Sequence, residues 1–282
     1  MTGKRRARAA PPADERPRIR RAYVECRFGQ LHVTTAFPVG GGFDERATLV
    51  CVHGGSSSSR VFRPFIEEIG RDRSVYAPDL PGCGESDPPQ PKPTIEDYAG
   101  ALADFLDQMR FRQVDVLGQH AGAFIAAELA IARPAVVRRL MLVGVPALSA
   151  QERAAYARTV MSPAYAADGS HLLADWQHAV QSHDPQLSLA DTAADFAIKL
   201  YNGPDSWWLP NAALGYAAGE RLPLVGQPVL LVRTHDHLWD ASLRARSWIR
   251  HLKLLELPQH GGGIFRSAPA VLATHVRAFL DS

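Results

Sequence analysis

The residues best suited to chemistry lie in one short stretch, Gly118-Gln-His-Ala-Gly122. An apolar strand pattern, Val114 to Leu117, precedes this stretch, and a run of small and apolar residues that indicates a helix follows it. His120 is therefore predicted at the tip of a tight strand-to-helix turn, between the two glycines that such a turn requires. An imidazole has an ordinary pKa of ~6.5, which suits proton transfer near neutral pH.

The stretch has the form of a Gly-x-Ser-x-Gly nucleophile elbow in which histidine replaces the serine. An imidazole has no hydroxyl to acylate, and an acyl-imidazole is short-lived, so a serine-type acyl-ester cycle is not expected. We expect His120 to act instead as a general acid or base toward water or a bound carbonyl compound. Ester or lactone hydrolysis by activated water, retro-aldol cleavage, decarboxylation and cyclisation are all compatible with that role.

The elements around the elbow alternate between strand and helix. A hairpin with its turn at Gly29-Gln30 is predicted first. Further strands are predicted at 47–53, 74–77, 139–143, 228–233 and 252–257, and helices at 61–70, 94–109, 241–251 and 269–280. The stretch 114–128 supplies one more strand, which runs through the elbow turn into a helix of small residues. Between about 146 and 225 the pattern is mostly helical and rich in aromatic residues. This order predicts an α/β fold: a mostly parallel sheet of about eight strands, helices on both faces and a helical lid.

Charge is distributed unevenly along the 282-residue chain. The formal net charge is +2, but residues 1–21 carry eight basic and two acidic side chains, which leaves −4 for the remainder. Residues 1–21 also lack bulky apolar residues, so we expect a disordered basic leader there. We expect residues 22–146 and 226–282 to form the core and residues 147–225 to form the lid.

Several classes of protein are excluded by what the sequence lacks. No apolar run reaches the ~18 residues of a membrane span, and the N-terminus lacks the apolar core expected of a secretory signal. Three cysteines, Cys26, Cys51 and Cys83, have no disulfide or metal-ligand spacing, which indicates reduced thiols in a cytoplasmic protein. No phosphate loop or dinucleotide fingerprint is present. We expect a small-molecule substrate, no cofactor and no nucleic-acid or membrane partner; the oligomeric state stays open.

Taken together, these features resemble the α/β-hydrolase-fold superfamily over residues 22–282. The resemblance is carried by the elbow, the position of the helical lid, His53-Gly-Gly55, Asp79-Leu-Pro-Gly-Cys-Gly-Glu-Ser-Asp87 and Leu230-Leu-Val-Arg-Thr-His-Asp236. It implies an oxyanion hole formed by the backbone N–H groups of Gly55 and Ala121, with Gly54 supplying the turn. These donors belong to the backbone, so the loss of the serine does not remove them.

The resemblance also implies an acid after the strand at 228–233 and a histidine after the last strand. At the acid position, Asp236 is our choice for the carboxylate that would orient an imidazole, and Asp240 is a second candidate. A strict alignment of the strand end instead places His237 at the acid position. His260 fits the histidine by its chemistry, although counting back from the last helix places Gly262 there instead. We assign catalysis to His120, Asp236 and His260.

Six further residues are expected to line the substrate pocket: His53, Gly54, His237, Trp207, Trp208 and Tyr216. The pocket should suit a small, largely apolar ester, lactone or β-dicarbonyl compound. Two alternatives remain. In a metal-dependent enzyme, His120, His260 and either His237 or His235 would hold a catalytic zinc ion. In a non-catalytic binding protein, the pocket would survive without the nucleophile.

Overall fold

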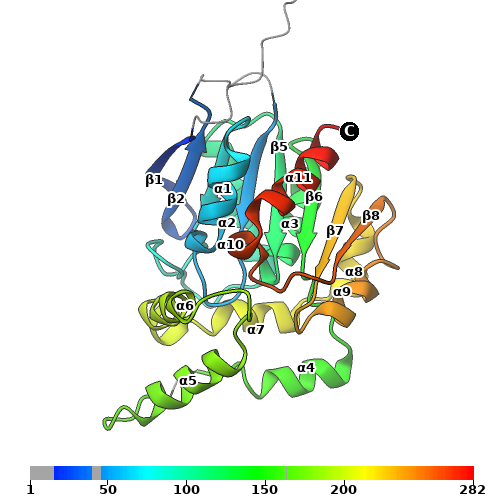
Figure 1. Cartoon of the computed structure of the whole chain (residues 1–282). Coiled ribbons are helices and arrows are strands. Elements are labelled where there is room, and N and C mark those ends of the chain that lie inside the picture. Colours follow the sequence, from blue (N-terminus) through cyan, green and yellow to red (C-terminus); the bar gives the residue numbers. More distant parts are fainter. Residues whose placement is uncertain (1–15, 40–45, 163) are drawn as a thin grey trace, which may run out of the picture.

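The central feature of the fold is an eight-stranded sheet with the order β1-β2-β4-β3-β5-β6-β7-β8 (Figure 1). The computed structural model describes residues 16–39, 46–162 and 164–282. β2 runs antiparallel to β1 and β4, and the other neighbours are parallel. The strands are β1 (Arg18–Cys26), β2 (Gly29–Phe37), β3 (Thr48–Val52), β4 (Val75–Pro78), β5 (Val114–Gln119), β6 (Val137–Val143), β7 (Val229–Thr234) and β8 (Leu252–Leu257). The predicted fold class is confirmed.

Helices cover both faces of the sheet because its strands are apolar on both sides. In β5, Val114 and Val116 pack with helices α2 and α3, whereas Leu117 packs with the cluster that includes α1 and α11. These core helices are α1 (Arg63–Ile69), which follows the 3-10 turn η1 (Ser59–Phe62), α2 (Ile95–Gln108), α3 (Ala121–Ala132), α9 (Trp239–Ala245), α10 (Ile264–Ser267) and α11 (Pro269–Leu280). No helix in the described ranges is long and apolar enough to cross a membrane.

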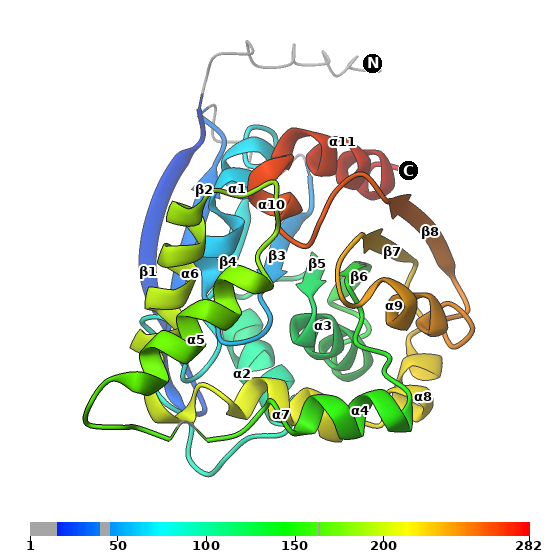
Figure 2. The same cartoon turned by 60° about the horizontal axis from the view of Figure 1, so that its bottom comes forward.

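Five helices between β6 and β7 form what we call the helical insert. They are α4 (Ala150–Ala157), α5 (Ser170–Gln181), α6 (Leu189–Tyr201), α7 (Trp208–Gly215) and α8 (Ala218–Arg221), with 3-10 turns η2 (Gly203–Asp205) and η3 (Leu222–Leu224). Figure 1 shows the insert across the carboxyl ends of the parallel strands. In Figure 2, which brings this end forward, α5 and α6 lie toward β1 and β4, and α4 and α7 lie side by side below α3. The insert therefore faces the end of the sheet that carries the elbow.

Three sequence predictions need correction. The hairpin turn lies before Gly29, because Gly29 already pairs with Cys26 as the first residue of β2. Residues 18–21 of the predicted leader belong to β1, where pairing with β2 satisfies their backbone groups; residues 1–15 lie outside the described residues. α9 ends at Ala245 rather than 251, because the carbonyl of His251 already accepts a sheet bond from Val229.

The elbow itself requires very close backbone packing. A Cβ added to Gly118 would lie 2.2 Å from the carbonyl oxygen of Gly122, and one added to Gly122 would lie 2.3 Å from that of Val52 in β3. His120 adopts φ 51° and ψ −119°, which a non-glycine residue adopts only at a cost of order 1–3 kcal/mol. The two glycines thus let the turn pack against β3 and present His120 at its tip.

Gly122→Ala is expected to lower the free energy of unfolding by about 2–3 kcal/mol, because the new methyl group would overlap the β3 backbone. Gly215→Ala is the matched control, since Gly215 also lies in a helix but has no atom within 4 Å of its added Cβ. The control should be neutral or stabilise by up to about 1 kcal/mol. Urea unfolding of both variants measures the difference, and equal stabilities would contradict the packing described.

Candidate active site

The elbow places the imidazole of His120 against the carboxylate of Asp236. Nε2 of His120 lies 3.3 Å from Oδ2 of Asp236. His120 caps α3 at the end of β5, and Asp236 lies in the loop after β7, so two parallel strands separated by β6 deliver the pair to one edge of the sheet. The His120 side chain is 26% exposed and that of Asp236 is 9% exposed, so the imidazole remains open to a ligand while the carboxylate is sheltered.

Asp236 is held as a carboxylate. Burial opposes its ionisation, but the hydrogen bond and the charge of His120, together with the backbone N–H of Leu238 at 2.8 Å, outweigh burial and lower the pKa of Asp236. The hydroxyl of Thr234 donates to the same carboxylate at 3.2 Å. Asp236 is therefore a fixed acceptor. Asp240, the second candidate for the acid, is exposed in the first turn of α9.

The carboxylate decides which nitrogen of His120 carries a proton. An ionised carboxylate only accepts hydrogen bonds, so the facing nitrogen, Nε2, must donate. In the neutral ring, Nδ1 then holds the free lone pair. The separation of 3.3 Å is long for a charge-assisted bond. This arrangement leaves Nδ1 as the atom of His120 that can accept a proton.

Two glycines make room for this pair, and one of them was not anticipated. A Cβ on Gly144, which follows β6 with φ +64°, would lie 2.6 Å from Cδ2 of His120. A Cβ on Gly262 would lie 3.2 Å from Oδ2 of Asp236. Gly262 is thus the residue of its loop that faces the acid, as counting back from the last helix indicated. The only signal for Gly144 in the sequence was its place directly after a buried strand.

His260, predicted as a catalytic residue, forms hydrogen bonds through its backbone. Its carbonyl oxygen accepts from the N–H of His235 at 2.7 Å, and its N–H donates to Leu257 at 3.0 Å. Within the described ranges, no hydrogen bond involves its imidazole. The carboxylate of Asp184, in the helical insert, accepts from the N–H of Gly263 at 2.8 Å in the same loop. The structure thus does not join the His260 imidazole to the pair, because the short loop turns Gly262 toward Asp236.

A second imidazole, that of His237, lies beside the first. Its ring centroid is 5.5 Å from that of His120, at 75° to it. Tyr156 of α4 stacks on its other side, with ring centroids 6.2 Å apart and an interplanar angle of 4°. Desolvation and the nearby His120 lower the pKa of His237, and Asp236 offsets this only in part. His237 is therefore neutral near pH 7. No local pattern in the sequence indicates that Tyr156 approaches the site.

The predicted oxyanion donors lie next to the elbow. The position of a Cβ on Gly54 would be 2.8 Å from Cβ of His120 and 3.0 Å from the backbone nitrogen of Ala121, so the His-Gly-Gly turn packs directly on the elbow. Ala121 is the first residue of α3, so its N–H has no acceptor within the helix. Gly55 adopts φ +59° and has nothing within 4 Å of its Cβ position. This geometry is compatible with both donors serving an oxyanion.

The expectation that His53 lines the pocket is wrong. Its side chain is fully buried, and Nε2 accepts a hydrogen bond from the backbone N–H of Leu80 at 2.9 Å. Burial lowers the pKa of His53, which keeps the ring neutral. His53 therefore holds the loop after β4 in place, a long-range contact that its neighbours in the sequence do not indicate.

The three aromatic residues predicted to line the pocket, Trp207, Trp208 and Tyr216, have separate surroundings in the helical insert. Tyr216 is buried beside α3, and its hydroxyl donates to Glu128 at 2.7 Å. Trp207 lies under the Nζ of Lys92, 4.0 Å from the ring centroid. Trp207 and Trp208 are half-buried where α7 begins. None of these contacts involves His120 or Asp236.

The imidazole trio of the metal hypothesis is not assembled. Among the residues that the structure describes, no group of three or more His, Cys, Asp or Glu side chains is arranged to hold a metal ion. His120 and His237 lie close together, but His235 joins His260 only through the backbone.

The electrostatics of the two imidazoles can be tested by NMR titration of His237. Replacing His120 by Gln removes the ring whose charge lowers the pKa of His237, so that pKa should rise toward its ordinary value of 6.5. Replacing Asp236 by Asn removes a negative charge, so the pKa of His237 should fall further. Shifts in the same direction for both variants would contradict the arrangement.

Known proteins share this architecture. The family described as alpha/beta hydrolase fold matches residues 47–262. The 2-hydroxy-6-oxo-2,4-heptadienoate hydrolase of Pseudomonas putida is 33% identical over 105 residues, which are 36% of this chain and 38% of that protein. The 2-hydroxymuconate semialdehyde hydrolase of a Pseudomonas species is 34% identical over 100 residues, 34% of this chain and 35% of that protein. The matches therefore span little more than a third of these curated relatives.

Solved structures extend the similarity to nearly the whole chain. The enol-lactonase from Burkholderia xenovorans superposes with a TM-score of 0.75 at 15% identity, covering 93% of this chain and 100% of that one. An esterase from Thermogutta terrifontis gives 0.74 at 17% identity, with 93% and 98% covered. These likenesses show the fold. Since the family match also covers most of the chain, the protein belongs to the α/β-hydrolase-fold family.

Proposed function

We propose that this protein is a hydrolase or lyase-type enzyme that acts on a small, largely apolar carbonyl compound without an acyl-serine intermediate. The observation that carries the proposal is the contact between Nε2 of His120 and Oδ2 of Asp236 at the tip of the elbow. This contact orients an imidazole base beside the backbone donors of Gly55 and Ala121. The helical insert serves as the lid over the substrate.

In the hydrolytic form of the reaction, Nδ1 of His120 takes a proton from a water molecule as its oxygen attacks the substrate carbonyl. The N–H groups of Gly55 and Ala121 stabilise the resulting oxyanion. The imidazolium, stabilised by the Asp236 carboxylate, then returns the proton to the leaving group as the tetrahedral intermediate collapses. The elbow histidine thus occupies the position of the serine but acts as the base, and water is the nucleophile.

The same groups support lyase-type chemistry. If Nδ1 of His120 takes the proton from a substrate hydroxyl or an activated carbon, the two backbone donors stabilise the resulting oxyanion or enolate. The neutral His237 ring, 5.5 Å away, is a second group able to exchange a proton with the substrate. His260 has no proton-transfer role in this scheme. The names of similar proteins, a heptadienoate hydrolase, an enol-lactonase and an esterase, support a carbonyl substrate.

The proposed role of His120 as the general base is tested by comparing wild type, His120→Ala and His120→Ser on a panel of activated esters, lactones and β-dicarbonyl compounds. His120→Ala should lower kcat on the best substrate about 10²- to 10⁴-fold, the range for a lost general base. Full activity in His120→Ala contradicts the proposal, and so does a wild type that turns over no member of a broad panel. The latter result favours a non-catalytic binding protein.

The orienting role of Asp236 has its own test, with His260 as the matched control. Asp236→Asn should lower kcat by up to about 10⁴-fold, because the amide no longer fixes the proton on Nε2 of His120. His260→Ala should retain most of the activity. Steady-state kinetics on the same substrate separates the two roles, and a larger loss in His260→Ala than in Asp236→Asn would overturn the assignment.

A further inference from the structure

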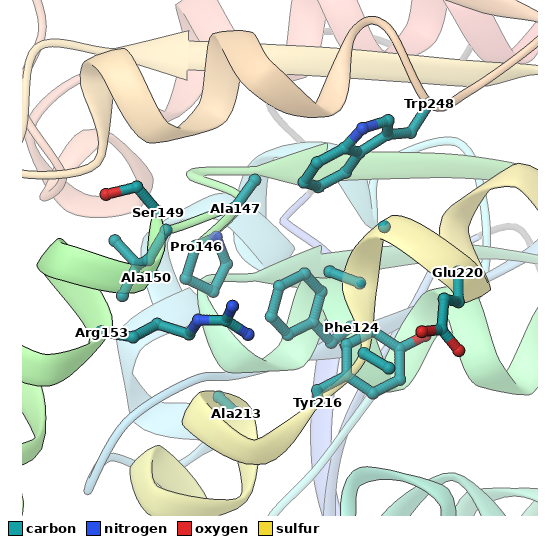
Figure 3. Close-up of a pocket in the computed structure, with 14 residues that line it drawn as sticks. Phe124, Pro146, Ala147, Ser149, Ala150, Arg153, Ala213, Tyr216, Glu220 and Trp248 are labelled. Carbon is teal, nitrogen blue, oxygen red and sulfur yellow. The ribbon is translucent and has the colours of Figure 1, made fainter.

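A pocket of about 360 Å³ lies beside α3, apart from the residues of the candidate active site. Fourteen residues line it, and His120, Asp236, His237, Gly55 and Ala121 are not among them. The lining residues come from α3, from α4 and the segment before it, from α7 and α8 with the residues between them, and from the turn before β8 (Figure 3). Its volume is in the range of small-molecule sites. The pocket can therefore hold a ligand without displacing any residue of the proposed catalytic machinery.

Aromatic and small apolar side chains form most of the pocket wall. The rings of Phe124 and Tyr216 lie 4.6 Å apart at an angle of 37°. The hydroxyl of Tyr216 is engaged by Glu128 outside the lining, so its ring is held in place. Trp248 adds a third aromatic side chain on the opposite wall (Figure 3). Such a wall suits the apolar or aromatic body of a ligand.

Arg153 supplies the only cationic side chain of the lining. In Figure 3 its guanidinium extends from α4 toward the ring of Phe124. Within the described ranges, no hydrogen bond or ion pair involves that guanidinium. Arg244 nearby differs, because it pairs with Glu152 and donates to the carbonyl of Ala147 at 2.7 Å. Arg244 fixes the rim of the pocket, and Arg153 remains available to an anion.

The only acidic side chain of the lining, Glu220, limits the charge of that anion. Figure 3 shows Arg153 and Glu220 on opposite sides of the pocket. One cation and one anion leave the lining neutral overall, so a second negative charge on the ligand would meet Glu220. A guanidinium binds a carboxylate with two parallel hydrogen bonds.

We propose that this pocket is a binding site for a monocarboxylate with an apolar or aromatic body. The body lies among Phe124, Tyr216 and Trp248, and the carboxylate pairs with Arg153. The pocket shares no residue with the His120 pair, so ligand binding there can be tested separately from the proposed reaction.

Isothermal titration calorimetry with 3-phenylpropionate tests the site, with 3-phenylpropionamide as the uncharged probe. The acid should bind about tenfold more tightly than the amide, as one charge-assisted contact provides. Arg153→Gln should abolish that preference, whereas Glu220→Gln, the matched control, should keep or strengthen it. Ala213→Leu, which fills the pocket, should weaken both probes.

Equal binding of acid and amide by the wild type, or an unchanged preference in Arg153→Gln, overturns the proposal. Circular dichroism of each variant verifies its fold. His120→Ala should bind 3-phenylpropionate as the wild type does, because the pocket lies apart from the elbow. Loss of binding in His120→Ala would place the ligand at the catalytic site instead and contradict the inference, whatever the outcome of the activity assays.

Discussion

The imidazole of His120 reaches the carboxylate of Asp236 because the backbone turns sharply between β5 and α3. That turn requires Gly118 and Gly122, since an added Cβ at either position would lie within 2.4 Å of a backbone carbonyl oxygen. It leaves His120 with φ 51°, a conformation that the surrounding core must maintain. The packing of β3, β5 and α3 thus sets the direction in which the side chain of His120 points.

Electrostatics then gives each group in the site a distinct role. Asp236 stays ionised because donors surround it despite burial, while His237 stays neutral because desolvation and His120 act in the same direction. Two imidazoles beside one carboxylate are therefore not equivalent. One is paired and oriented, and the other is neutral and lies next to Tyr156 of the insert. This division of roles is what acid–base chemistry needs near neutral pH.

Local patterns in the sequence were sufficient to predict much of the fold. The helix start at Thr94 is confirmed, with a capping box to Asp97, and the predicted strand at 252–257 coincides with β8. The elbow glycines were also evident, because their requirement arises within one turn. Residues that act through contacts distant in the chain were not. The burial of His53 and the approach of Gly144 to His120 depend on how strands pair, which no local pattern contains.

The central claim is that Asp236 holds the proton of His120 on Nε2 and leaves Nδ1 free to act as the base. Nitrogen-15 NMR of the imidazole of His120 tests this claim without a substrate, with His120→Gln used to assign the signals. For the neutral ring, the account predicts a protonated Nε2 and an unprotonated Nδ1, with this preference lost in Asp236→Asn. A neutral ring that carries its proton on Nδ1 in the wild type would contradict it.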